Sequence, residues 1–136
     1  MDEIPWEALR VRAREASARS YAPYSKVTVG AAGYTADRQF VEGSNVENAS
    51  FGLTLCAECS LVSDLIRTGS SQLVAVAIVA GDGEPLAPCG RCRQVLFEHG
   101  GGDILIDAGT HSHARRLAEL LPEAFGPVDL GVRQSP

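Results

Sequence analysis

All four cysteines of the chain lie in two short segments, and this arrangement constrains the fold more than any other feature. The segments are Cys56–Cys59 (CAEC) and Pro88–Cys92 (PCGRC), and they are far apart in the sequence. Cysteine pairs at this spacing favour metal or redox chemistry over structural disulfides in a compartment that keeps thiols reduced. If both segments serve one site, the fold must bring them side by side.

Three kinds of site fit these cysteines. A structural zinc site would use all four, since Cys56 and Cys59 would lie one helical turn apart. A dithiol redox centre at Cys89 and Cys92 would leave Cys56 and Glu58 unexplained. A catalytic zinc site would use Cys56, Cys89 and Cys92 and keep one coordination position open. Glu58 would then be the nearby proton acceptor, for which a structural site has no use. The cysteines alone leave the structural and catalytic zinc sites both open.

Size, charge and hydropathy exclude several classes of function. The chain has 136 residues and an ordinary globular composition, which predicts a single domain over residues 1–136. A formal net charge of −5 without a basic block disfavours a nucleic-acid groove. The longest apolar run, Leu73–Ala80, is too short to span a bilayer, and the N-terminus lacks signal-peptide features. We therefore expect a cytoplasmic protein without nucleic-acid or membrane partners.

Hydrophobic periodicity and turn residues predict alternating helices and strands. The expected helices are 5–19, 56–68, 89–99 and 115–121, and the expected strands are 27–34, 39–44, 73–80 and 104–106. The valine-rich run at 73–80 is typical of a central strand covered on both faces. This order predicts an α/β sandwich whose later strands are parallel and joined by right-handed crossovers.

Both cysteine segments fall at the starts of expected helices, 56–68 and 89–99. Unpaired backbone N–H groups and the positive end of the helix dipole stabilise thiolates at such positions. Two helix starts brought together would therefore suit anionic sulfurs and a metal ion. We expect the first of these helices to bury Leu55, Val62, Leu65 and Ile66.

Further motifs identify a family. Cys56–Glu58 (CAE) and Pro88–Gln94 (PCGRCRQ) resemble the zinc-dependent cytidine deaminases of the small, homotetrameric type. The other matching stretches are Tyr21–Ser25, Val29–Ala32, Asn45–Asn48 and Leu120–Phe125. They follow the family's order over nearly the whole chain. The resemblance implies an α/β fold, a three-layer α/β/α sandwich around a mixed, largely parallel sheet of about five strands.

The resemblance also implies a mechanism and a metal. One Zn²⁺ per subunit would be held by Cys56, Cys89 and Cys92 and would activate a water to attack the ring carbon that bears the amino group. Glu58 would take the water proton, pass it to the ring nitrogen and later protonate the departing ammonia. The Ala57 backbone N–H would hold the carbonyl oxygen of the base.

Four more residues are implied at the substrate site. In the family, the pair that corresponds to Asn45 and Glu47 grips the sugar hydroxyls of the nucleoside. Family tetramers complete each site from a neighbouring subunit, and by position Phe51 and Phe125 would contribute to it. Considered without the family, these two aromatic residues favour core positions.

The chain departs from the family pattern at two positions. Many members carry an arginine after the catalytic glutamate, where it offsets thiolate charge, and this chain has Cys59. Arg91 or Arg93 would have to substitute, or the helix termini must suffice. Val27 stands where the family usually stacks a phenylalanine on the pyrimidine, a contact worth ~1–3 kcal/mol. We therefore expect Val27 to weaken the affinity for cytidine or to change the substrate.

We therefore expect hydrolytic deamination of cytidine or deoxycytidine to uridine or deoxyuridine with release of ammonia, as in pyrimidine salvage. A blasticidin-type deaminase shares both zinc segments; Glu47 counts against that substrate, and Val27 leaves room for it. A non-catalytic binding domain with a four-cysteine zinc site is the alternative from another class. His111 and His113 lie in a polar stretch, and we expect solvated loop residues there and no metal pair.

Overall fold

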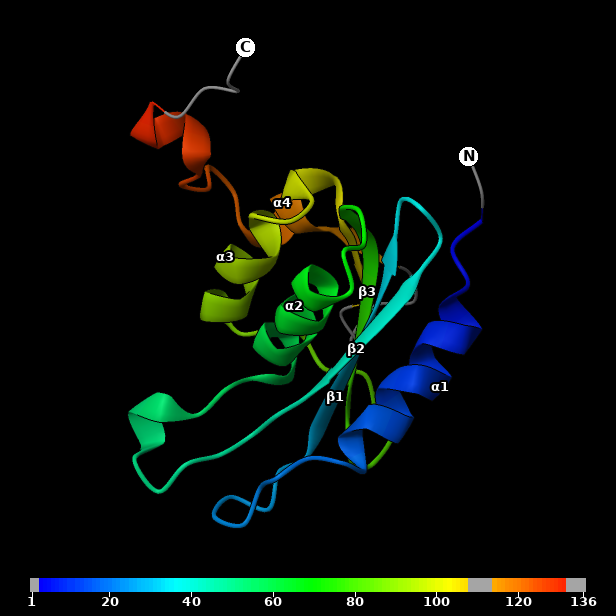
Figure 1. Ribbon diagram of the computed structural model, residues 1–136, viewed down its shortest axis with the longest axis vertical. Coiled ribbons are helices and arrows are strands. Elements are labelled where there is room, and N and C mark those ends of the chain that lie inside the picture. The colour runs from blue at the N-terminus through cyan, green and yellow to red at the C-terminus, as the bar shows by residue number, and fades with distance from the viewer. Residues whose placement is uncertain (1–2, 108–113, 132–136) are drawn as a thin grey trace.

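The computed structural model describes residues 3–107 and 114–131, and it has a five-stranded sheet with helices on both faces (Figure 1). His111 and His113 lie outside the described residues. The strands are β1 (Val29–Thr35), β2 (Phe40–Ser44), β3 (Leu73–Ala80), β4 (Leu105–Asp107) and β5 (Arg115–Arg116). The α-helices are α1 (Trp6–Ser17), α2 (Ala57–Arg67), α3 (Gly90–Phe97) and α4 (Leu117–Leu120), with 3₁₀ turns η1 (Phe51–Leu53), η2 (Gly101–Asp103) and η3 (Pro127–Leu130). Within these residues no helix is long and apolar enough to cross a membrane.

The strands lie in the order β2-β1-β3-β4-β5. β1 is antiparallel to both β2 and β3, β3 is parallel to β4, and β4 is antiparallel to β5. The prediction of a mixed five-stranded sheet is confirmed, but the prediction that it is largely parallel is wrong, because one of the four described pairings is parallel. The β1–β2 hairpin places β1 between β2 and β3, which run in the same direction. The segment 108–114 before β5 is shorter than a parallel crossover requires.

The three layers are visible in Figure 1, where α1 lies on one side of the sheet and α2 and α3 lie on the other. Side chains along β3 alternate between the two layers, as expected of a strand buried on both faces. Val76 and Ile78 belong to the core under α2 and α3, whereas Ala75, Ala77 and Val79 belong to the core under α1. The predicted central strand at 73–80 is confirmed residue for residue.

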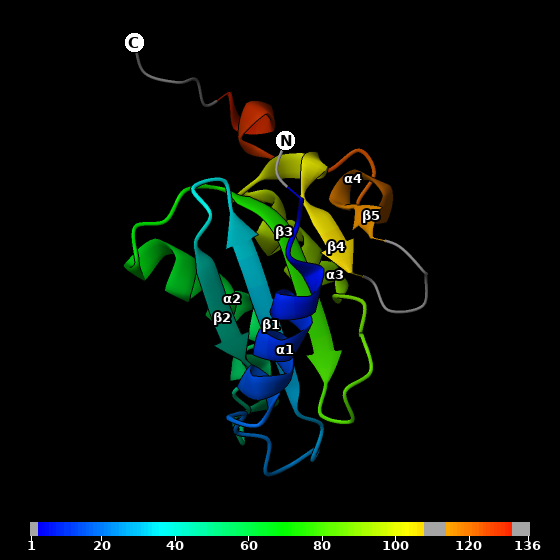
Figure 2. The ribbon, with the colours of Figure 1, turned by 90° about the vertical axis from the view of Figure 1, so that its right-hand side faces the viewer.

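Figure 2 looks onto the face that α1 covers. Small side chains line this interface, including Ala13 of α1 with Ala32 and Ala77 of the sheet. At Gly30 of β1, a Cβ atom would lie 1.9 Å from the carbonyl oxygen of Ala13. Helix α1 therefore packs on the backbone of β1 with almost no side chain between them.

Helix α2 packs on β2 in the same close way, and this contact positions the start of α2. Gly43 of β2 lies under the first turn of α2, beside the backbone of Ala57 and Leu61. The side chain of Asp64 reaches the outer edge of the sheet, where its Oδ2 accepts the N–H of Glu42 at 3.0 Å. α2 is therefore fixed both to the face and to the edge of β2.

Two predictions about helices need correction. Residues 115–121 form the short strand β5 followed by α4, because Arg115 and Arg116 pair with β4. The buried positions of α2 are Ala57, Glu58, Leu61 and Leu65. Of the residues expected there, Leu65 is buried, whereas Ile66 is 62% exposed and Leu55 precedes the helix.

We predict that Gly43→Ala destabilises the fold by about 1–3 kcal/mol or more, as expected of overpacking. The added Cβ would lie 2.2 Å from the carbonyl oxygen of Ala57 and 2.3 Å from the nitrogen of Leu61, and backbone atoms cannot swing aside. Urea unfolding of the metal-free protein measures this change. Gly52→Ala is the control, because a Cβ there meets nothing within 4 Å. Equal unfolding midpoints for the two variants would contradict the prediction.

Candidate metal centre and active site

Three sulfur atoms meet where α2 and α3 begin. Cys56 is the N-cap of α2, Cys89 is the N-cap of α3, and Cys92 lies in the first turn of α3. Their Sγ atoms all lie within 4.8 Å of one another, and the Sγ atoms of Cys56 and Cys89 are 4.0 Å apart. Zinc–sulfur bonds of about 2.3 Å in tetrahedral geometry separate sulfurs by roughly 3.8 Å. The three thiols therefore fit one zinc ion.

The fourth cysteine lies elsewhere. Cys59 is not part of the sulfur group and lines a separate hollow with Glu42, Asp64 and Arg67. Cys56 is the N-cap residue and has an extended backbone, with φ −71° and ψ 158°, whereas Cys59 lies within the first turn of α2. The two cysteines are therefore not related by regular helical geometry. The structure brings together the three cysteines of the catalytic site and leaves out the one that a four-cysteine site requires.

The three thiols differ in their pKa. Burial raises the pKa of Cys92, and Glu58 and Cys56 raise it further. Burial also raises the pKa of Cys56. For Cys89 burial acts in the same direction, but the N–H of Cys92 and the neighbouring thiols outweigh it, so the pKa of Cys89 is lowered. Cys89 is therefore the thiol that ionises most readily.

The two arginines considered as partners of the thiolates have other contacts. Arg93 donates from Nε to the carbonyl of Pro88 and from a terminal nitrogen to the carbonyl of Leu120, both at 2.8 Å. Arg91 donates to the carbonyl of Thr54 at 3.4 Å. Both guanidinium groups thus bond backbone carbonyls, and the positive ends of α2 and α3 also favour thiolates at the helix starts.

Glu58 lies in the first turn of α2 and is only 4% exposed. Burial raises its pKa, although its own N–H and the thiol of Cys92 partly oppose this by donating to the carboxylate. A raised pKa makes the carboxylate a better proton acceptor near neutral pH. The predicted acid–base residue is thus buried in direct contact with one of the three thiols.

A pocket of about 230 Å³ opens beside the sulfur group. Cys56, Glu58 and Cys89 contribute to its polar end. Apolar walls come from residues far apart in the sequence, namely Val29, Leu55, Leu86 and Ala87. Ala57 also lines it, and the first N–H groups of a helix have no partner within that helix. We call this space the base pocket.

Asn45 also borders the base pocket, and it is buried. Its side-chain amide makes two hydrogen bonds to the chain that leads into β1. Oδ1 accepts the N–H of Val29 at 2.8 Å, and Nδ2 donates to the carbonyl of Val27 at 2.9 Å. An amide oxygen has two lone pairs and an amide nitrogen has two hydrogens, so each keeps capacity for a ligand.

Glu47 borders a second hollow with Tyr24, Ser25, Phe51 and Thr54. Thr54 also lines the base pocket, so the two spaces are neighbours. We call the second space the outer pocket. The predicted pair at 45 and 47 is therefore divided between two adjoining pockets.

The carboxylate of Glu47 has three hydrogen-bond donors around it. It accepts the N–H of Tyr24 at 3.0 Å, the N–H of Ser25 at 3.1 Å and the hydroxyl of Ser25. The hydroxyl and then the N–H of Ser25 are the main reasons that the pKa of Glu47 is lowered. Glu47 is therefore ionised at neutral pH.

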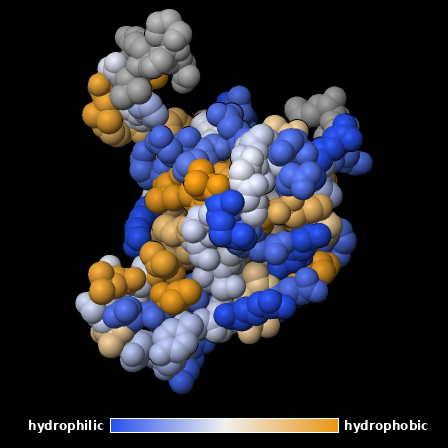
Figure 3. All heavy atoms as spheres, in the orientation of Figure 1, coloured by the Kyte–Doolittle hydropathy of each residue, from blue (hydrophilic) through white to orange (hydrophobic). Residues whose placement is uncertain are grey.

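The two aromatic residues implied at a neighbour's site lie on the surface, so the expectation of core positions is wrong for both. Phe51 is 74% exposed and lies edge-on to Tyr24, with ring centroids 6.1 Å apart. Phe125 is 57% exposed, and Gln94 Nε2 donates to its carbonyl at 2.7 Å. Apolar side chains also gather over the loop that carries η1 (Figure 3). Val27, at the position where the family stacks an aromatic ring, is exposed as well.

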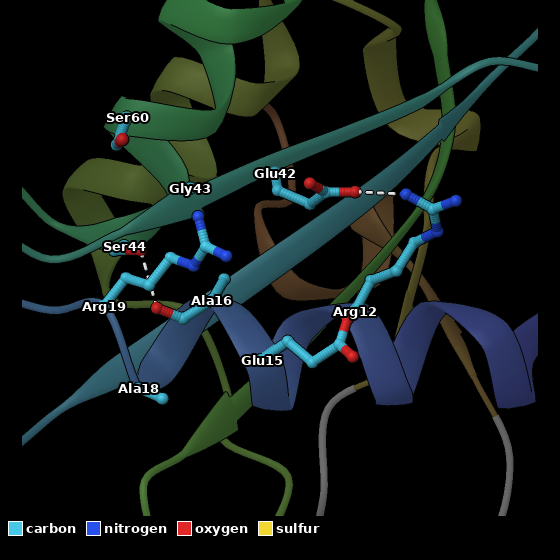
Figure 4. Close-up of a pocket in the computed structure, with 9 residues that line it drawn as sticks. All are labelled: Arg12, Glu15, Ala16, Ala18, Arg19, Glu42, Gly43, Ser44 and Ser60. Carbon is cyan, nitrogen blue, oxygen red and sulfur yellow. Dashed lines mark hydrogen bonds and ion pairs between the residues drawn. The ribbon is translucent and has the colours of Figure 1, made fainter.

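A larger hollow lies away from this site. It measures about 590 Å³ and lies between α1, β2 and α2 (Figure 4). Arg12 forms an ion pair with Glu42 across it at 2.6 Å, and Glu15, Arg19 and Ser60 also line it. None of the predicted site residues lines this hollow, whereas five of them line the smaller base pocket, namely Asn45, Cys56, Ala57, Glu58 and Cys89.

Sequence reasoning missed Thr54, Ser25 and Leu86 as parts of the site. Leu86 precedes the second cysteine segment by two residues, a position that could have predicted a pocket wall. Ser25 was part of a matched motif, but only the folded chain shows its hydrogen bond to Glu47.

Comparisons with known proteins agree with this geometry. Residues 6–107 match the model of the cytidine and deoxycytidylate deaminase zinc-binding region. A cytidine deaminase of Mycobacterium tuberculosis (strain CDC 1551) is 53% identical over 130 residues, which cover 96% of each chain. A cytidine deaminase of Halalkalibacterium halodurans is 39% identical over 88% of this chain and 91% of its own.

Solved structures are equally similar. The crystal structure of the M. tuberculosis cytidine deaminase has a TM-score of 0.87 and 53% identity, covering 91% of this chain and 99% of the other. The cytidine deaminase from Mycobacterium leprae has a TM-score of 0.86 and 50% identity, covering 89% and 100%. Fold, sulfur group and sequence agree, and the chain belongs to the zinc-dependent cytidine and deoxycytidylate deaminase family.

Proposed function

We propose that this protein hydrolyses cytidine or deoxycytidine to uridine or deoxyuridine and ammonia. The observation that carries the proposal is the group of three thiols within 4.8 Å of one another beside the buried carboxylate of Glu58. The group lies at the polar end of a pocket with apolar walls, as a pyrimidine ring would require. Relatives named as cytidine deaminases, at up to 53% identity, support the same reaction.

Cys56, Cys89 and Cys92 would hold the zinc ion. When bound, the metal supplies a Lewis acid that makes water a better nucleophile. With three protein ligands, one coordination position would stay open for water, and Cys56 and Cys89 also border the base pocket.

Glu58 moves the protons. Its carboxylate accepts a proton from the attacking water and delivers it to the ring nitrogen next to the reacting carbon. The carboxylate then takes the remaining proton from the added hydroxyl and delivers it to the amino group, which leaves as ammonia while the carbonyl of the product forms. The Ala57 N–H at the start of α2 binds the carbonyl oxygen of the base and fixes the ring orientation. Burial of Glu58, by raising its pKa, suits a group that must both accept and return a proton.

Asn45 and Glu47 bind the sugar. With the base next to the sulfur group, the sugar extends past Thr54 toward the outer pocket. Within the described chain, the residues that line the two pockets include the carboxylates of Glu47 and Glu58 and no lysine or arginine. This lining suits an uncharged nucleoside and disfavours a nucleotide phosphate.

We predict that Glu58→Gln keeps its zinc and loses turnover by a factor of about 10²–10⁴, the range for a lost general acid–base group. The amide cannot exchange a proton, whereas the three thiols are unchanged. Ammonia release from cytidine measures turnover, and elemental analysis measures zinc. Glu98→Gln, at an exposed glutamate after α3, is the control. Unchanged turnover in Glu58→Gln would refute the proton-transfer role.

We predict that Cys56→Ser abolishes stoichiometric zinc and that Cys59→Ser leaves zinc content and thermal stability close to wild type. The two cysteines are on one helix start, but only Cys56 belongs to the sulfur group. Metal content after dialysis against a mild chelator separates the two outcomes. Loss of zinc and unfolding in Cys59→Ser would favour the four-cysteine site and contradict the catalytic one.

The protein acts as a homotetramer of single domains spanning residues 1–136, with sites completed by neighbouring subunits. The base pocket is smaller than the roughly 300–1,000 Å³ usual for small-molecule sites, which fits a site that one chain leaves incomplete. Exposed apolar side chains lie near it, including Phe51 and Leu53, and Phe125 is available to reach a neighbour. The four free cysteines suit a reducing, cytoplasmic compartment.

We predict that Leu53→Glu lowers the assembly state, because Leu53 is an exposed leucine on the η1 loop. A charge buried without a partner at an interface opposes association. Sedimentation velocity measures the mass of each species. Leu130→Glu, at a comparably exposed leucine in η3, serves as the control for surface charge. A wild-type protein that sediments as a monomer would contradict the tetramer.

A further inference from the structure

The chain that leads from α1 into β1 is held by the two proposed sugar-binding residues. Asn45 bonds the backbone of Val27 and Val29, and Glu47 bonds the backbone of Tyr24 and Ser25. These hydrogen bonds also orient the two side chains, because the backbone of the same segment determines where Asn45 and Glu47 can point. Glu47 is the more exposed of the two, so its orientation depends more on these bonds than on packing.

The hydroxyl of Ser25 is fixed from both sides. It donates to Oε2 of Glu47, and it accepts the N–H of Val27 at 3.0 Å. A hydroxyl that already accepts a backbone hydrogen bond is polarised and becomes a better donor. Ser25 therefore points its proton at Glu47.

These contacts leave Glu47 with limited free capacity. An ionised carboxylate offers about four lone-pair positions. Three are filled by the donors from Tyr24 and Ser25, so roughly one is left for a ligand. The hydroxyl of Ser25 thus determines which lone-pair position of the Glu47 carboxylate remains free to accept a hydrogen bond from a ligand.

We propose that Ser25 is a positioning residue that presents Glu47 to a sugar hydroxyl of the substrate. This inference rests on the proposed function and adds detail to its sugar recognition. In the pair of Ser25 and Glu47, only Glu47 touches the substrate. The lowered pKa of Glu47 is consistent with the same contact, because the hydroxyl of Ser25 is its largest cause.

Other bonds hold the segment independently of this hydroxyl. Tyr21 donates its N–H to the carbonyl of Asn45 at 3.0 Å and accepts the N–H of Glu47 at 2.8 Å. Ser20 Oγ donates to the carbonyl of Val29 at 3.0 Å. Removal of the Ser25 hydroxyl therefore changes the orientation of Glu47 more than the path of the backbone.

The kinetic test compares two substrates in the zinc-loaded protein, cytidine and 2′,3′-dideoxycytidine, which lacks the ring hydroxyls. In Ser25→Ala, we expect KM for cytidine to rise about tenfold, the low end for a hydrogen bond to a charged group, with kcat unchanged. We expect KM for dideoxycytidine to stay the same. Ser25→Thr, which keeps a hydroxyl, should restore KM for cytidine.

Ser20→Ala is the matched control, because it removes a serine hydroxyl that holds the same segment without touching Glu47. We expect it to leave KM for both substrates close to wild type. A carboxyl-carbon NMR titration gives a readout besides activity. The pKa of Glu47 should rise toward its ordinary value of about 4.3 in Ser25→Ala and stay low in Ser20→Ala.

Two results would overturn the inference while the proposed function stands. One is an equal rise in KM for both substrates in Ser25→Ala, which would mean a general loosening of the site. The other is an unchanged KM for cytidine. A zinc-loaded wild-type protein that deaminates neither nucleoside would instead overturn the proposed function, and the sugar contact with it.

Discussion

The close contact between β2 and the first turn of α2 is the constraint on which the site depends. Gly43 has no Cβ, so the backbone of α2 can lie directly on the strand. The start of α2 then meets the start of α3, and Cys56 comes within 4.0 Å of Cys89. A side chain at position 43 would clash with the backbone of Ala57, the residue that follows Cys56.

Burial and the two helix starts have opposite effects on negative charge in this site. Three thiols and Glu58 bring several potential negative charges together, and burial raises the pKa of Glu58 and of Cys92. The starts of two helices supply the opposing partial charge. Arg93, which follows Cys92 in the sequence, instead donates to the carbonyls of Pro88 and Leu120 and so holds the segment just before Cys89.

Local patterns predicted much of this molecule. The valine-rich run at 73–80 predicted a central strand, and the family resemblance identified the three thiols that meet. Tertiary pairing was harder to predict. β5 is two residues long, and it forms by pairing with β4 at the end of the sheet. β1 lies between β2 and β3, because the β1–β2 hairpin pairs with β3 through β1. The exposure of Phe51 and Phe125 was not predicted from the residues alone, because an aromatic residue carries the same hydrophobicity in a core and on a surface.

The bond from the Glu42 N–H to Asp64 has a consequence for assembly. β2 is an outer strand of the sheet, and outer strands with free amides recruit strands from other molecules. Here a carboxylate from α2 already occupies one outward amide. A further strand cannot pair through that amide, so strand addition at this edge of the sheet is obstructed at Glu42.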